Sequence, residues 1–131
     1  MRETDRNRKR IGKQGEMAAR AYLEHLGWEI VAANYRCIHG EMDLIAREIN
    51  GAQITLVFVE VKTRRGSRHG MPGEAVDARK QGRLIAIAQA FLAEKQGGGD
   101  EPAYRFDVVE VVTGPDGLMT VHRYPAAFTA D

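Results

Sequence analysis

Two carboxylates and one ammonium group form the set of side chains in this sequence most suited to chemistry. Glu60 and Lys62 close an otherwise apolar run at residues 54–59, and Asp43 lies one hairpin upstream. A run this rich in β-branched and aromatic residues is typical of a buried strand. Because strand side chains alternate between faces, Glu60 and Lys62 share a face. Buried charges are costly unless they pair or hold a metal, so we expect compensating chemistry here.

A hairpin brings the second carboxylate to the first. Asn50-Gly51 is a strong two-residue hairpin signal, and counting outward from it makes Asp43 and Glu60 near neighbours at the open end. A bulge in either strand would reverse the face of one of them. Two carboxylates held close repel unless a divalent cation lies between them, and Mg²⁺ favours oxygen ligands completed by waters and phosphates. Lys62 would then orient an attacking water or stabilise a pentavalent phosphate. The set predicts phosphodiester cleavage; the competing interpretation is an ion-pair cluster at a strand end.

Positive charge is concentrated although the net charge is only +1. Residues 2–13 and 62–83 are strongly basic, whereas the C-terminal half is nearly balanced. Two basic segments beside a carboxylate pair favour a polyanionic partner, and the alternative is a solvated surface. The residues we expect to contact phosphate are Arg64, Arg65, Arg68, Lys80 and Arg83.

Several other classes of site and location are disfavoured. Cys37 is the only cysteine, so a disulfide framework and a cysteine zinc site are excluded. Cys37 and His39, two apart on a strand-like segment, make a poor nucleophile–base pair. The charged N-terminus has no apolar stretch behind it, and no segment is apolar enough to span a membrane. We therefore expect a cytoplasmic protein.

Periodicity predicts one α/β domain over residues 12–131, preceded by a flexible basic segment at residues 1–11. The first helix is expected from Lys13 to Leu26, with Met17 and Leu26 in its apolar stripe. A second helix is expected at residues 74–96. The expected strands lie at residues 28–33, at 41–47, from 54 onward, at 104–113 and at 118–124.

This order predicts how the sheet is built. Short turns join the first three strands, which should form an antiparallel meander. The second helix is long enough to cross back over the sheet, so the fourth strand should run parallel to the third. The predicted fold is a mixed four- to five-stranded sheet flanked by helices, in the order α-β-β-β-α-β-β.

The strings around the carboxylates are distinctive as a combination. They are GEMDLIA at 40–46 and VFVEVKTR at 57–64, accompanied by GKQGE at 12–16, NYR at 34–36 and RFDVV at 105–109. Together they resemble the YraN-like family of predicted bacterial endonucleases over residues 12–128. By resemblance that family belongs to the PD-(D/E)XK nuclease superfamily, close to the archaeal Holliday-junction resolvases.

The resemblance implies a restriction-endonuclease-like core and a role for each matching residue. Asp43 and Glu60 would hold Mg²⁺ or Mn²⁺, and Lys62 would be the catalytic lysine. Glu16 matches a helix-1 glutamate that reaches the same metal in resolvase-like proteins. One departure is Met42, which replaces the proline that precedes the first aspartate in the superfamily. The glutamine-to-tyrosine motif of the exonuclease branch is also absent.

Three functions are compatible with these features. The first is a metal-dependent endonuclease that hydrolyses phosphodiester bonds in DNA, with branched or structured DNA favoured by resemblance. The second is a non-catalytic nucleic-acid-binding module that retains the nuclease fold. The third is a purely structural or protein-interaction domain. Oligomeric state is open between a monomer and the homodimer of resolvase-like proteins.

Overall fold

The computed structural model describes residues 3–66, 76–95 and 101–130. Two helices and five strands follow one another in the predicted order. They are α1 (Glu3–His25), β1 (Glu29–Cys37), β2 (Gly40–Asn50), β3 (Gln53–Arg65), α2 (Ala78–Lys95), β4 (Ala103–Thr113) and β5 (Met119–Phe128).

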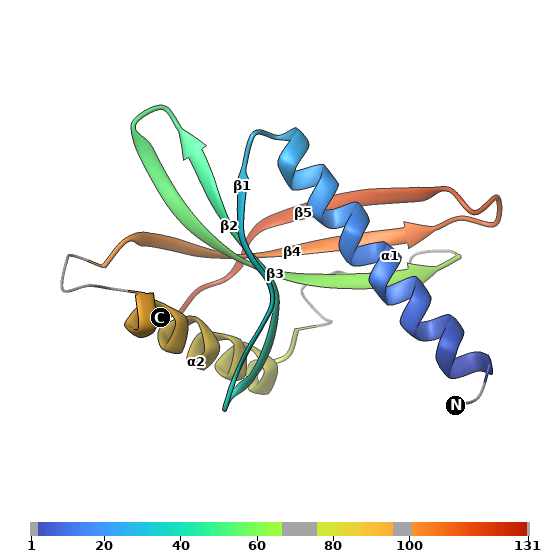
Figure 1. Ribbon diagram of the computed structural model, residues 1–131, viewed down its shortest axis with the longest axis horizontal. Coiled ribbons are helices and arrows are strands. Elements are labelled where there is room, and N and C mark those ends of the chain that lie inside the picture. Colours follow the sequence, from blue (N-terminus) through green and yellow to red (C-terminus); the bar gives the residue numbers. More distant parts are fainter. Residues whose placement is uncertain (1–2, 67–75, 96–100, 131) are drawn as a thin grey trace.

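The five strands form one sheet in the order β1-β2-β3-β4-β5 (Figure 1). Strands β1, β2 and β3 pair antiparallel, and the loop that joins β2 to β3 is Gly51-Ala52, one residue later than the predicted Asn50-Gly51 turn. Strands β3 and β4 pair parallel, because α2 carries the chain back along the sheet, and β5 returns antiparallel to β4. The predicted fold class and strand directions are confirmed.

Each face of the sheet is covered by one helix, as Figure 1 shows. Phe58 and Phe91 belong to the apolar cluster between the sheet and α2, and Leu23 and Val57 belong to the cluster beneath α1. Burial on both faces explains why β3 and β4 are nearly continuous apolar runs rather than alternating ones. Within the described ranges, neither helix is long and apolar enough to cross a membrane.

Some predicted boundaries were wrong. Helix α1 begins at Glu3 instead of Lys13, and so includes most of the segment assigned to a flexible arm. Its arginines, lysines and glutamates are good helix formers, so high charge does not exclude a helix. Met17 and Leu26 are exposed instead of joining the core. Helix α2 begins at Ala78, where the Asp77 carboxylate accepts a hydrogen bond from the Lys80 N–H at 2.9 Å and caps the helix.

Candidate active site

The predicted carboxylate pair lies where two strands separate. The pairing of β2 with β3 ends at Leu44 and Val59, so Asp43 and Glu60 are the next residues outward. Beyond this point the Val61 N–H donates to the side chain of Asp43, at 2.7 Å from Oδ2, instead of to a backbone carbonyl of β2. In Figure 1, β1 and β2 turn away from β3 in this region. The structure thus confirms that the two carboxylates are neighbours at the open end of the hairpin.

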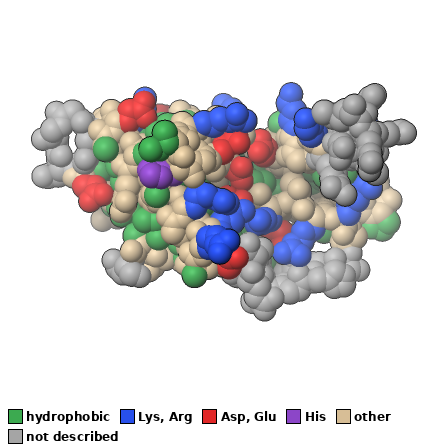
Figure 2. All heavy atoms as spheres, turned by 90° about the horizontal axis from the view of Figure 1, so that it is seen from below, with side chains coloured by type: hydrophobic (Ala, Val, Ile, Leu, Met, Phe, Trp, Pro, Cys, Tyr) green, Lys and Arg blue, Asp and Glu red, His purple; other side chains and the backbone are tan. Residues whose placement is uncertain are grey.

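The gap between the strands opens into a hollow of about 460 Å³. Its charged lining consists of Glu41, Asp43, Glu60, Lys80 and Arg83, and residues 37–40 at the turn between β1 and β2 form its rim. On the face of the molecule seen in Figure 2, acidic side chains gather near the middle and Lys and Arg side chains surround them. An acidic centre within a basic surround suits a cation and a polyanion bound together.

Two ammonium groups converge on Glu60, whose side chain is almost buried at 10% exposure. Lys80 Nζ lies 2.7 Å from Glu60 Oε1, and Lys62 Nζ lies 3.9 Å from the same oxygen. The predicted shared face of Glu60 and Lys62 is therefore observed. The i,i+3 spacing of Lys80 and Arg83 suggested that they line the groove beside the carboxylates, and both line the hollow. The sequence did not indicate that Lys80 pairs with Glu60.

The electrostatics of the cluster move two pKa values toward neutrality. Burial, and then the charge of Glu60, raise the pKa of Asp43 from 3.8 to about 7, although the Val61 N–H opposes the shift. Burial, and then the neighbouring Lys80 ammonium, lower the pKa of Lys62. For Lys80, burial disfavours the charge but the Glu60 carboxylate raises the pKa overall. Perturbed groups in an open hollow are typical of sites that transfer protons.

Helix α1 brings a third carboxylate toward the pair. A side chain at Gly15 would collide with Thr63 of β3, so this glycine lets the helix approach the sheet. With its amide nitrogen turned toward both carboxylates, Asn34 donates to Glu41 at 2.9 Å and to Glu16 at 3.2 Å. Burial raises the pKa of Glu16, and the charges of Glu41 and Glu60 add to the shift while Asn34 opposes it.

Asn34 was quoted only as part of a motif in the sequence and received no role there. Its φ of 55° lies in the left-handed region, which Asn tolerates better than most residues. This conformation falls inside β1, next to the separating strands. The sequence shows that residue 34 is an asparagine, but it does not show that the backbone here is left-handed or that two carboxylates lie beside the side chain.

The donor set fits a hard divalent cation that keeps part of its water shell. Asp43 and Glu60 offer only oxygens, and their mutual repulsion, visible in the raised pKa of Asp43, is relieved by a cation between them. Among the residues that the structure describes, no three His, Cys, Asp or Glu side chains gather to hold one metal. Mg²⁺ is commonly bound through one or two carboxylates plus waters and substrate phosphates, so a pair suffices. Metal contact by Glu16 stays a prediction.

The remaining predicted cations lie in different environments. Arg64 Nε lies 2.9 Å from Glu110 Oε2, and Glu110 is fully buried on β4. Arg65 and Arg83 are exposed and available to a phosphate. Arg68 lies outside the described residues. Arg64 thus has a structural partner that the sequence did not indicate.

Arg64→Ala should lower the free energy of unfolding by about 2 kcal/mol, because it leaves the buried Glu110 carboxylate without this charge partner. Arg65→Ala, the adjacent exposed arginine, should change stability by less than about 0.5 kcal/mol. Urea unfolding of both variants checks the difference. Equal stability of the two variants would contradict a structural role for the Arg64–Glu110 pair.

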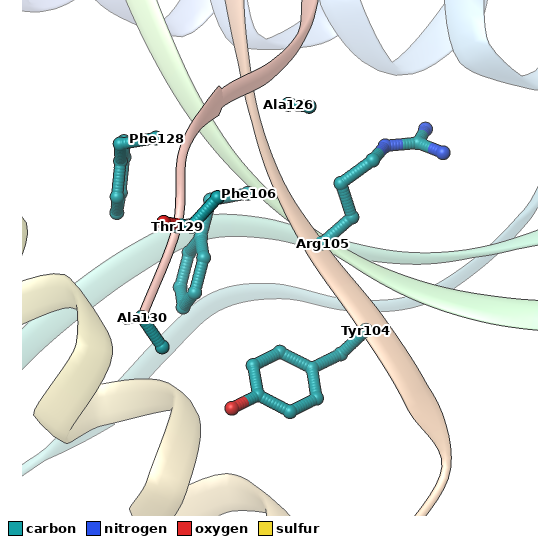
Figure 3. A pocket seen from close by; sticks show the side chains of 7 residues that line it. All are labelled: Tyr104, Arg105, Phe106, Ala126, Phe128, Thr129 and Ala130. Carbon is teal, nitrogen blue, oxygen red and sulfur yellow. The ribbon is translucent and has the colours of Figure 1, made fainter.

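A second hollow, of about 230 Å³, lies elsewhere in the sheet and is shown in Figure 3. Tyr104, Phe106 and Phe128 line it, and the Arg105 guanidinium points away from the rings. Phe106 and Phe128 stack at 4.7 Å between ring centroids. This hollow contains no carboxylate, and we do not assign it a catalytic role.

The sequence also matches known proteins. The model of the uncharacterised protein family UPF0102 matches residues 15–111, a range that includes every charged residue lining the first hollow. A UPF0102 protein of Symbiobacterium thermophilum is 49% identical over 122 residues, covering 93% of this chain and 98% of the relative. A UPF0102 protein of Nocardia farcinica is 43% identical over 118 residues, covering 90% and 88%. One from Caldanaerobacter subterraneus is 42% identical over 112 residues, covering 86% and 87%.

Proposed function

This chain belongs to the uncharacterised protein family UPF0102, and we propose that it is a divalent-metal-dependent endonuclease that hydrolyses phosphodiester bonds in DNA. The observation that carries this proposal is the Asp43–Glu60 pair at the separating ends of β2 and β3, with the Lys62 ammonium 3.9 Å from Glu60. The order of helices and strands agrees with the one that the resemblance to PD-(D/E)XK nucleases implied, and this agreement supports the proposal.

Asp43, Glu60 and Lys80, which line the hollow, and Lys62, which lies 3.9 Å from Glu60, have separate roles in the proposed reaction. Asp43 and Glu60 would hold Mg²⁺ or Mn²⁺, which when bound supplies Lewis-acid activation of a water and offsets charge on the phosphate. Lys62, with its lowered pKa, is placed to take a proton from the attacking water or to stabilise the charged phosphorus centre. Lys80 keeps its charge beside Glu60 and offsets part of the negative charge of the Asp43–Glu60 pair.

The surface around the hollow supports a nucleic acid substrate. Arg83 lines the hollow, and Arg65 is exposed at the end of β3. Both are suited to phosphates that flank the one being cleaved, and such contacts position a substrate without reading its sequence. Branched or otherwise structured DNA is the substrate class that the resemblance to resolvases favours.

One observation favours a second function. Lys80 already neutralises Glu60 at 2.7 Å, and this ion pair satisfies the carboxylate without a metal. A nucleic-acid-binding module that retains the nuclease fold would keep such a pair and use the arginines alone. Under that function, loss of Asp43 leaves DNA affinity near the wild-type value, whereas loss of Arg65 and Arg83 weakens binding and flattens its salt dependence.

A cleavage assay separates the two functions. The protein is incubated with four-way junction, flap, single-stranded and duplex DNA, each with Mg²⁺, Mn²⁺ or EDTA. We expect metal-dependent products, greatest with structured DNA, that fall at least about 100-fold in Lys62→Met and in Glu60→Gln. Binding of the junction without products under any metal condition would favour the non-catalytic module.

Lys80→Met should tighten binding of Mn²⁺ to the protein about three- to tenfold at pH 8, because removing this ammonium takes away a charge that competes with the cation for Glu60. Calorimetric titration with Mn²⁺ in the absence of DNA measures the change. Arg79→Met is the matched control, since Arg79 is an exposed cation one residue earlier on the same helix. Unchanged or weaker Mn²⁺ binding in Lys80→Met would mean that the cation does not bind at Glu60.

A further inference from the structure

The turn between β1 and β2 ends in an apolar side chain that the protein does not cover. Ile38 is 96% exposed and lies between Cys37, the last residue of β1, and His39, which is exposed. It is more exposed than any other large apolar side chain in the described part of the chain, including Leu118 at 70%. A single exposed apolar side chain is common on protein surfaces and needs no partner by itself. What distinguishes Ile38 is its place on the rim of the hollow that Asp43 and Glu60 line.

The turn is held firmly although its tip is exposed. The Tyr35 hydroxyl donates to Glu94 Oε2 of α2 at 2.7 Å, and the Tyr35 ring meets Phe91 edge-on at 5.2 Å. Gly40 has a φ of 133° and lies so close to α2 that a Cβ there would approach Arg83 and Ile87 side-chain atoms at 3.4 Å. These contacts fix the direction in which Ile38 is presented.

The position of the tip relates it to the charged hollow. Ile38 and His39 line the same hollow as Asp43 and Glu60. If a phosphodiester of a DNA strand occupies this hollow, the bases next to it lie close to Ile38 and His39 on the rim. Arg36, whose side chain is 80% exposed next to the turn, lies 3.6 Å from Glu41 and brings a cation to the approach. An apolar tip with basic neighbours suits nucleic acid, because apolar side chains can insert between bases while cations meet phosphates.

We propose that Ile38 is a wedge that contacts and unstacks a base next to the phosphodiester bound in the hollow, where Arg83 offers a phosphate contact that does not need a metal. Since the hollow is the proposed cleavage site, this inference rests on the proposed function and adds a substrate-recognition element to it. A second copy of the chain is a poorer occupant. A stable interface buries about 800 Å² on each partner, and a single isoleucine flanked by Arg36 and His39 offers far less apolar area. Unstacking is least costly at a branch point or in a single strand, so the wedge favours structured DNA.

Fluorescence of 2-aminopurine placed at the branch point of a four-way junction tests the wedge. The measurement is made in EDTA with wild type, Ile38→Ser and Leu118→Ser, which is the matched control at an exposed apolar residue of another turn. Wild type and Leu118→Ser should raise the fluorescence at saturation, because 2-aminopurine brightens when it unstacks. Ile38→Ser should lose at least half of that rise and bind the junction about three- to tenfold more weakly, with a smaller loss on duplex DNA.

Two results would overturn the inference. One is an equal rise in fluorescence for Ile38→Ser and wild type at saturation. The other is a wild-type dimer in sedimentation velocity that becomes monomeric only in Ile38→Ser, which would assign the tip to a second copy of the chain. Because EDTA prevents cleavage, an Ile38-dependent rise without any cleavage in Mg²⁺ supports the wedge and rejects the nuclease. Cleavage in Mg²⁺ together with a fluorescence rise that does not depend on Ile38 supports the nuclease and rejects the wedge.

Discussion

Asp43→Asn will stabilise the metal-free protein at pH 8 while it removes the proposed cleavage activity. In the folded protein, burial and the charge of Glu60 raise the pKa of Asp43 from 3.8 to about 7. The folded state therefore keeps a proton that the unfolded chain releases between these two pH values. Stability from this group is fully present below pH 3.8 and is lost as pH rises to about 7. An asparagine carries no charge, and its amide oxygen can still accept the Val61 N–H.

The expected gain is large for a single substitution. A pKa shift of this size corresponds to at most about 4 kcal/mol, and relaxation around the site reduces it, so we expect about 2–3 kcal/mol at pH 8. Urea unfolding in EDTA at several pH values from 4 to 8 measures the gain, which should grow up to pH 7 and then level off. Glu41→Gln is the control, because Glu41 lies in the same hollow but is exposed. Addition of Mg²⁺ should stabilise wild type and leave Asp43→Asn unchanged. A gain that does not depend on pH would contradict this electrostatic explanation.

Asp107→Ala will destabilise the protein by about 3–5 kcal/mol, because it removes a buried charge that several groups share. Asp107 is fully buried on β4. Its carboxylate accepts from Arg105 Nε at 2.7 Å and Arg105 Nη2 at 2.9 Å, from Arg123 Nη1 at 3.2 Å and from the Ala126 N–H at 2.9 Å. Both guanidinium groups also lie over the Trp28 ring, at 5.7 and 5.0 Å from its centroid. Removal of the carboxylate leaves two partly buried cations without this anion.

Chemical denaturation of two further variants keeps this prediction measurable. Small domains have about 5–15 kcal/mol of stability, so at the lower end of this range Asp107→Ala would be partly unfolded and milder variants are needed. Asp107→Asn preserves the shape of the side chain and should cost less than the alanine but still more than about 1 kcal/mol. Glu48→Ala is the control, because Glu48 binds the same Arg105 from a more exposed position and should cost about 1 kcal/mol or less. If Asp107→Ala were no less stable than Glu48→Ala, the buried network would not hold this end of the sheet together.

The sequence was sufficient for the sheet and for the carboxylate pair because both depend on local signals. The Asn-Gly signal located the hairpin to within one residue, since Asn50 pairs with Gln53 and the loop is Gly51-Ala52. This register makes Asp43 and Glu60 neighbours. The length of the segment between β3 and β4 requires a crossover, which makes these strands parallel. Strand alternation then puts Lys62 on the face of Glu60.

Contacts between distant elements were not predictable in the same way. The i,i+3 spacing of Lys80 and Arg83 suggested that both line the groove of the site, but nothing in that spacing shows that Lys80 reaches Glu60. Arg64 looked like a phosphate contact because its partner, Glu110, is 46 positions later in the chain, on the neighbouring strand. The periodicity of α1 placed Met17 in the core, but the small residues Gly15 and Ala19 make the close approach to the sheet.

The most direct test compares the cleavage of a labelled four-way junction by wild type and by Asp43→Asn at pH 8 with Mg²⁺. Asp43→Asn is expected to be at least as stable as wild type in the absence of metal, so a loss of activity cannot be attributed to unfolding. We predict that wild type cuts the junction, that EDTA stops the reaction, and that Asp43→Asn is slower by at least about 1,000-fold while it still binds DNA. Equal cleavage by the two proteins, or binding by both with no cleavage by either, would contradict a metal-dependent nuclease site at Asp43 and Glu60.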